Sequence, residues 1–120
     1  MTTPTLRTEP ELVGNVDDLV ANAGVAALVQ GVQVAIFHLP QHGLFGLGNF
    51  DPFSEAAVLS RGVVGDVEGE PVVASPVYKQ HFSLHTGRCV EDPRIRVPVY
   101  EVELRGEQVF VGGIRAASAA

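Results

Sequence analysis

Residues 24–39 read GVAALVQGVQVAIFHL, and this stretch decides the fold class. It holds two runs rich in valine, alanine and other apolar residues, 24–29 and 32–38, separated by the dipeptide Gln30-Gly31. A two-residue connection that contains glycine between two such runs is typical of a β-hairpin. The stretch therefore predicts two antiparallel strands, and the turn PQHG that follows predicts a third strand in LFGLG.

The same arrangement recurs twice further along the chain. Residues 63–75 read VVGDVEGEPVVAS, and residues 97–112 read VPVYEVELRGEQVFVG. Each stretch consists of two β-rich runs around a central turn that contains glycine. In the second stretch, apolar residues alternate with glutamates, which predicts a strand with one buried face and one solvent-exposed face.

Helical patterns are confined to residues 16–24 and 53–62, and both segments are short. A parallel α/β sheet needs helical segments of about 10–15 residues between its strands, and the chain has none. The predicted fold class is therefore all-β: an antiparallel β-sandwich or small barrel with short helical turns.

The composition restricts the class of protein. A chain of 120 residues with 46% hydrophobic residues fits one domain, which we place at residues 11–113 between a disordered tail (1–10) and a loose tail (114–120).

The net charge of −6 and the lack of a basic run argue against nucleic-acid binding. No apolar run reaches the roughly 18 residues of a membrane span. The single cysteine excludes an internal disulfide, which suits the cytoplasm.

Three residues attract attention as metal ligands or catalytic groups: His81, His85 and Cys89. On a helix their spacing of four would align them, but the surrounding residues favour extended structure, and the turn Thr86-Gly87 separates His85 from Cys89. A catalytic thiol at Cys89 would need a lowered pKa, for which Arg88 is the neighbouring cation. The favoured interpretation is two exposed or partly satisfied histidines beside a buried cysteine.

Two segments resemble the cluster-binding loops of the Rieske iron–sulfur family. The first loop, residues 48–62, and the second loop, residues 72–89, retain the frame of these loops at Leu59, Ser60, Gly62, Pro76, Phe82, Leu84, Thr86 and Gly87. Asn49, Asp51, Ser75 and Tyr78 stand at the ligand positions that the resemblance implies. A Rieske [2Fe–2S] centre needs two thiolates and two imidazoles, and a chain with one cysteine cannot supply them.

A Rieske-like domain without these ligands resembles one family in particular, the small subunit of assimilatory NAD(P)H-dependent nitrite reductase. The pieces VLSRGVVGD, YKQHF, EDP and VPVY carry the resemblance, which spans about residues 12–111. It implies a large-subunit partner with siroheme, FAD and a [4Fe–4S] cluster that reduces nitrite to ammonium. It also implies that this chain has no catalytic, cofactor-binding or metal-binding residues of its own. The alternative is a stand-alone Rieske-fold domain with a binding or regulatory role and no cluster.

Because binding residues collect on loops at one end of a rigid β scaffold, the two loops are the expected partner interface. The candidate interface residues are Asn49, Asp51, Phe53, Arg61, Tyr78, Lys79, Gln80, His81 and Phe82. For Tyr78 and Phe82 two interpretations stay open: the rings contact the partner, or they fill the space of the missing cluster.

Overall fold

A computed structural model describes residues 9–114, which contain eleven strands and two 3-10 helices. The strands are β1 (Glu11–Asn15), β2 (Ala23–Val29), β3 (Val32–Leu39), β4 (Gly43–Gly48), β5 (Phe50–Asp51), β6 (Ala56–Ala57), β7 (Val63–Val67), β8 (Glu70–Ala74), β9 (His81–Ser83), β10 (Val99–Arg105) and β11 (Gln108–Ile114). The 3-10 helices are η1 (Val16–Asp18) and η2 (Leu59–Arg61). The predicted tails lie outside the described residues except for residues 9, 10 and 114, so the division into tails and domain stays a prediction.

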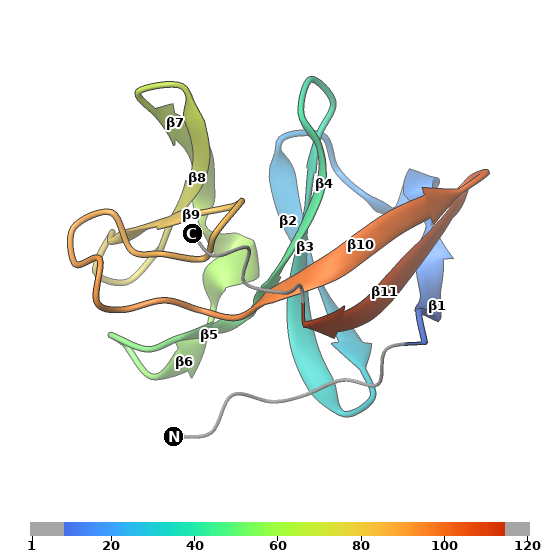
Figure 1. Ribbon diagram of the computed structural model, residues 1–120, viewed down its shortest axis with the longest axis horizontal. Coiled ribbons are helices and arrows are strands. Elements are labelled where there is room, and N and C mark those ends of the chain that lie inside the picture. Colours follow the sequence, from blue (N-terminus) through green and yellow to red (C-terminus); the bar gives the residue numbers. More distant parts are fainter. Residues whose placement is uncertain (1–8, 115–120) are drawn as a thin grey trace.

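The strands form two main layers, and every strand pair is antiparallel, as the hairpin pattern predicts (Figure 1). The large sheet has the order β1-β11-β10-β4-β3-β2, and the small sheet has the order β7-β8-β9. A cavity of about 150 Å³ is lined by residues of both edge strands of the large sheet, β1 and β2. The large sheet therefore curls until its edges face each other, which confirms a small all-β barrel-like fold.

The predicted hairpins are confirmed, and their turns explain why they form. Gln30 and Gly31 both have positive φ, +50° and +81°, and Glu68 and Gly69 repeat this with +50° and +89°. Two central residues with positive φ define the turn type whose twist matches that of the strands it connects. In the third hairpin, Gly106 has a φ of +63°.

The helical pattern over residues 16–24 was predicted to form a helix, and that prediction is wrong beyond the first turn. The Asn15 side chain caps η1 by accepting a hydrogen bond from Asp17 N at 3.0 Å, and Asn15 N donates to Asp18 Oδ2 at 2.9 Å. The helix ends at Asp18 because Leu19 is already extended, and the chain enters β2 at Ala23, which pairs with His38 of β3. Sheet pairing therefore replaces the helical hydrogen bonds.

The second predicted helix, over residues 53–62, is also wrong apart from η2. Its local backbone hydrogen bonds form isolated turns, and residues 59 and 60 bond to a residue distant in the sequence. Leu59 N donates to Asn49 O at 3.1 Å, and Ser60 N donates to Asn49 Oδ1 at 2.7 Å. The buried Asn49, which lies between β4 and β5, thus determines the local conformation.

The strand β3 is buried on both faces, which places it between two hydrophobic cores. Ala35, Phe37 and Leu39 point into the core between the two sheets. Val34 and Ile36 point into the core inside the curled large sheet. The unbroken apolar run of this strand follows from its central position. Within the described residues, no helix is long and apolar enough to cross a membrane.

Candidate functional site

The first and second loops lie against each other at one end of the small sheet (Figure 1). Asp51 of the first loop is fully buried and joins them. Within its own loop, its carboxylate accepts hydrogen bonds from Phe53 N at 2.8 Å and from Ser54 Oγ at 2.9 Å. From the second loop, the buried Ser75 hydroxyl donates to the same carboxylate. Two of the four Rieske ligand positions are thus hydrogen-bonded directly to each other.

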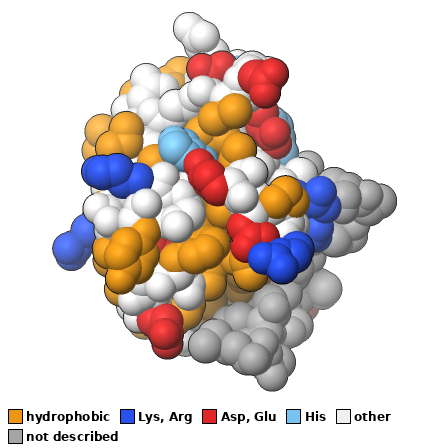
Figure 2. Space-filling model, turned by 90° about the vertical axis from the view of Figure 1, so that its left-hand side faces the viewer, with side chains coloured by type: hydrophobic (Ala, Val, Ile, Leu, Met, Phe, Trp, Pro, Cys, Tyr) orange, Lys and Arg blue, Asp and Glu red, His pale blue; other side chains and the backbone are white. Residues whose placement is uncertain are grey.

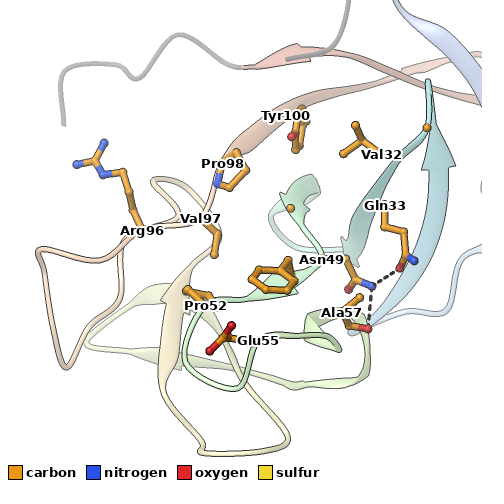
Figure 3. A pocket seen from close by; sticks show the side chains of 13 residues that line it. Val32, Gln33, Asn49, Pro52, Glu55, Ala57, Arg96, Val97, Pro98 and Tyr100 are labelled. Carbon is orange, nitrogen blue, oxygen red and sulfur yellow. Dashed lines mark hydrogen bonds between the residues drawn. The ribbon is translucent and has the colours of Figure 1, made fainter. Parts of the chain in front are cut away.

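Asn49, at a third ligand position, is also buried, and its side-chain amide is hydrogen-bonded through both its nitrogen and its oxygen. Its Nδ2 donates to Gln33 Oε1 at 3.1 Å and to Ala57 O at 3.2 Å (Figure 3). Its Oδ1 accepts from Ser60 N at 2.7 Å. An amide group has two N–H donors and one carbonyl acceptor, and here all three have protein partners.

The residues at the ligand positions do not fit a [2Fe–2S] cluster. A Rieske centre is held by thiolate and imidazole, whereas Asn49, Asp51 and Ser75 offer amide, carboxylate and hydroxyl groups. These groups are buried and occupied by one another or by the backbone. At the fourth position, Tyr78 has a side chain that is 61% exposed. The frame of the two loops is therefore retained while the chemistry of cluster binding is lost.

We expect Asp51→Ala to lower the free energy of unfolding by about 2–4 kcal/mol, because it leaves buried donors of both loops without an acceptor. Urea unfolding followed by far-UV circular dichroism measures the loss. Asp66→Ala is the matched control, since exposed Asp66 accepts a single hydrogen bond, from Gly69 N at 3.0 Å. Its expected cost is about 1 kcal/mol or less. An equal decrease in the free energy of unfolding in the two variants would show that the hydrogen bonds between the loops do not stabilise the fold more than an exposed turn does.

Tyr78 and Phe82, for which two interpretations were open, differ in their surroundings. Phe82 on β9 has no exposed surface and packs in the core between the sheets, with the Phe53 ring 6.1 Å away. Tyr78 lies in the turn before β9 and is exposed. Phe82 is therefore a core residue, and Tyr78 is a surface residue.

This burial corrects the expected interface at three positions. Asn49, Asp51 and Phe82 are inside the molecule and hold the loops in place, so their side chains cannot contact a partner in this conformation. The other candidates are at least partly accessible: Phe53, Arg61, Tyr78, Lys79, Gln80 and His81. For them, the role in an interface stays a prediction.

The three residues that attracted attention as metal ligands do not converge. His81 Nδ1 lies 2.6 Å from Glu91 Oε2, and the His85 ring packs edge-on against Phe45. Cys89 is fully buried. Among residues 9–114, no three His, Cys, Asp or Glu side chains are grouped so that they could hold a metal ion. The interpretation of accessible histidines beside a buried cysteine is confirmed.

Burial raises the pKa of the Cys89 thiol above its ordinary value, and the neighbouring Glu91 carboxylate adds to this effect. Arg88, the cation that a catalytic thiol at Cys89 would need, is not among the groups that shift this pKa. We predict that the Cys89 thiol reacts with Ellman's reagent at least about tenfold more slowly in the folded chain than in the urea-unfolded chain. Equal rates would contradict the burial of this side chain.

A groove of about 620 Å³ lies beside the first loop, and it was not predicted from the sequence (Figure 3). Its walls come from β3, from the turn after β5 and from residues 96–100. Its lining includes the apolar or aromatic residues Phe50, Pro98 and Tyr100. Such pockets are usually lined by apolar and aromatic side chains, which the run VPVY supplies in part.

The comparisons with known proteins agree with this geometry. A family model described as a Rieske-like [2Fe-2S] domain matches residues 11–112. Over 100 residues, the chain is 44% identical to the nitrite reductase (NADH) small subunit of Salmonella typhimurium, covering 82% of this chain and 92% of that subunit. The chain belongs to the Rieske-like family of nitrite reductase small subunits.

A solved structure of this small-subunit family has the same fold. The solution structure of the Escherichia coli protein NirD superimposes with a TM-score of 0.79 at 38% identity, covering 86% of this chain and 94% of that chain. The predicted all-β Rieske-like architecture is confirmed by this similarity.

A large subunit is also a relative of this small-subunit chain. The nitrite reductase [NAD(P)H] large subunit of Klebsiella oxytoca is 36% identical over 110 residues, which are 91% of this chain and 11% of that subunit. That large subunit thus contains a segment similar to nearly the whole domain described above. The domain occurs both as a separate small subunit and within the polypeptide of a large subunit.

Proposed function

We propose that this chain is the cofactor-free small subunit of an NAD(P)H-dependent assimilatory nitrite reductase. It binds a large subunit that carries siroheme, FAD and a [4Fe–4S] cluster and reduces nitrite to ammonium in the cytoplasm. The observation that carries the proposal is the segment of the K. oxytoca large subunit that is similar to this domain. A domain that is built into one large subunit can act on another as a separate chain.

The chemistry of the two loops supports a role in binding and not in electron transfer. The former ligand positions hold oxygen- and nitrogen-bearing groups that are hydrogen-bonded to each other and to the backbone. An iron–sulfur centre would need thiolates and imidazoles in their place. The chain therefore contributes surface to the enzyme, and the large subunit contributes the redox groups.

The accessible candidates of the two loops form the proposed contact region with the large subunit. Phe53, Arg61, Tyr78, Lys79, Gln80 and His81 make up this set. Tyrosine, phenylalanine and arginine, which this set contains, are enriched in protein interfaces. The net charge of −6 argues against nucleic acid as the partner.

Co-expression of the tagged chain with the nitrite reductase large subunit of the same organism tests the proposal. We expect the two chains to co-purify, with less than about 0.1 iron per small subunit when that chain is purified alone. We also expect nitrite-dependent oxidation of NADH or NADPH to rise when the small subunit is added back to the large subunit. Separate elution with unchanged activity would overturn the proposal in favour of a stand-alone domain. Stoichiometric iron and sulfide in the isolated small subunit would overturn its cofactor-free character.

A further inference from the structure

The tips of the two loops have the same backbone construction. The first tip, residues 51–55, reads DPFSE, and the second tip, residues 75–79, reads SPVYK. In each tip, the N–H of the fifth residue donates to the carbonyl oxygen of the first: Glu55 N to Asp51 O at 2.7 Å, and Lys79 N to Ser75 O at 3.1 Å. The first side chain of each also accepts from the N–H two residues later, at 2.8 Å and 3.3 Å. The tips are equivalent turns.

The two turns are joined at their bases and form one unit. The hydroxyl of Ser75, the first residue of the second tip, donates to the carboxylate of Asp51, the first residue of the first tip. Both residues are buried, so the joint lies below the surface. The outer residues of the two tips are consequently held in a fixed mutual arrangement.

Apolar side chains are exposed on both tips of this unit. Val77 is 46% exposed and Tyr78 is 61% exposed, and the two prolines that open the tips, Pro52 and Pro76, are also exposed. Figure 2 shows the side of the molecule that carries the small sheet, where apolar side chains gather among isolated basic and acidic ones. Exposed apolar side chains on ordered turns are typical of contact surfaces.

Glu55 and Lys79 end the two tips with opposite charges. Both are exposed, and neither takes part in an ion pair within residues 9–114. Each has a positive φ, +56° for Glu55 and +64° for Lys79. This conformation costs a residue with a side chain about 1 kcal/mol, which glycine would avoid. Strained residues of this kind concentrate at functional sites.

We propose that the two tips dock as one surface on the nitrite reductase large subunit, with Lys79 contacting a carboxylate and Glu55 contacting a basic side chain of that subunit. The proposal rests on the proposed function and names the part of the small subunit that makes the contact. The partner surface it fits is an apolar patch that also carries an acidic side chain for Lys79 and a basic side chain for Glu55. Such a pair of opposite charges fixes the orientation of docking and suppresses docking in the reversed orientation.

Lys79 is the only lysine of the chain, which permits a direct test. A zero-length carbodiimide joins an amine only to a carboxylate that touches it. In the complex of full-length subunits, we expect a cross-link between Lys79 and an Asp or Glu of the large subunit, located by mass spectrometry. Lys79→Arg keeps the charge and removes the amine, so this variant should bind normally and lose the cross-link. A complex that forms cross-links between the subunits at other positions, but none at Lys79, would overturn the contact at Lys79.

Replacing Glu55 and Lys79 with glycine tests their role in docking without lowering the stability of the fold. Because glycine relieves the positive φ, we expect Glu55→Gly and Lys79→Gly to leave the Tm unchanged or raise it. The double variant should bind the large subunit about tenfold more weakly, with a smaller dependence on salt concentration. Glu68→Gly is the matched control, because Glu68 has the same charge and a φ of +50° but lies in the turn between β7 and β8. It should bind like the unmodified chain.

Two outcomes separate this inference from the proposed function. If the unmodified small subunit does not bind the large subunit, the proposed function fails and the docking surface with it. If the unmodified chain binds and the double glycine variant binds equally well, the docking surface is overturned and the proposed function stands.

Discussion

Phe82→Ala is expected to lower the free energy of unfolding by about 3–5 kcal/mol, the usual cost of removing a buried aromatic ring. Phe82 has no exposed surface, and it pairs with Val73 across the small sheet and bridges to Cys89. Its ring also meets Phe53 of the first loop. Urea unfolding by far-UV circular dichroism measures the effect. A loss below about 1 kcal/mol would contradict its place in the core.

Tyr78→Ala is the matched comparison, because the two aromatic residues lie four positions apart in the same loop. The Tyr78 side chain is exposed, so its removal should change the free energy of unfolding by no more than about 0.5 kcal/mol. It should instead weaken binding to the large subunit by about tenfold, as expected for an interface tyrosine. Unchanged affinity for the large subunit would remove Tyr78 from the contact region.

Gly87→Ala is expected to have the second large effect, a loss of at least about 3 kcal/mol. Gly87 has a φ of +74°, and a Cβ added there would lie 2.1 Å from the backbone oxygen of Val97. The backbone cannot move aside cheaply, since Gly87 N donates to Ser83 O and Val97 N donates to Gly87 O. The variant therefore combines a strained conformation with a steric overlap.

A substitution in the turn between β7 and β8 distinguishes the cost of the strained conformation from the cost of the steric overlap. Gly69 has a φ of +89°, but no atom lies within 4 Å of a Cβ placed there. Gly69→Ala should cost only the conformational strain, about 1 kcal/mol. Thermal or urea unfolding of both variants measures the difference. Similar losses would show that the close approach of the Val97 backbone does not matter.

The hairpins were predictable from sequence because their determinants are local. A two-residue turn such as Gln30-Gly31 needs positive φ at both positions, and glycine supplies one of them. The helical segments were mispredicted because their determinants are distant. The conformation of residues 59–60 depends on hydrogen bonds to Asn49, which is separated from them by a hairpin.

The sequence was enough to predict which two loops form the candidate site, but not which of their side chains are buried and which are exposed. The resemblance to the Rieske loops assigned Asn49, Asp51, Ser75 and Tyr78 to the four ligand positions. The structure shows that two of them, Asp51 and Ser75, are hydrogen-bonded to each other. It was not predictable that Tyr78 is exposed while Phe82 is buried, because both are aromatic residues in a β-rich stretch. The positive φ of Lys79 changes the direction of the chain between them and breaks the alternation of a simple strand.

Hydrogen exchange measured by mass spectrometry tests the central claim most directly: the emptied Rieske site of this chain docks on the nitrite reductase large subunit. The amide exchange of the small subunit would be compared with and without the large subunit. We predict slower exchange in the complex at residues 53–55 and 77–80, with little change in β1, β2 and the turn between β7 and β8. Protection confined to those other elements, with both tips exchanging at their free rates, would contradict the account.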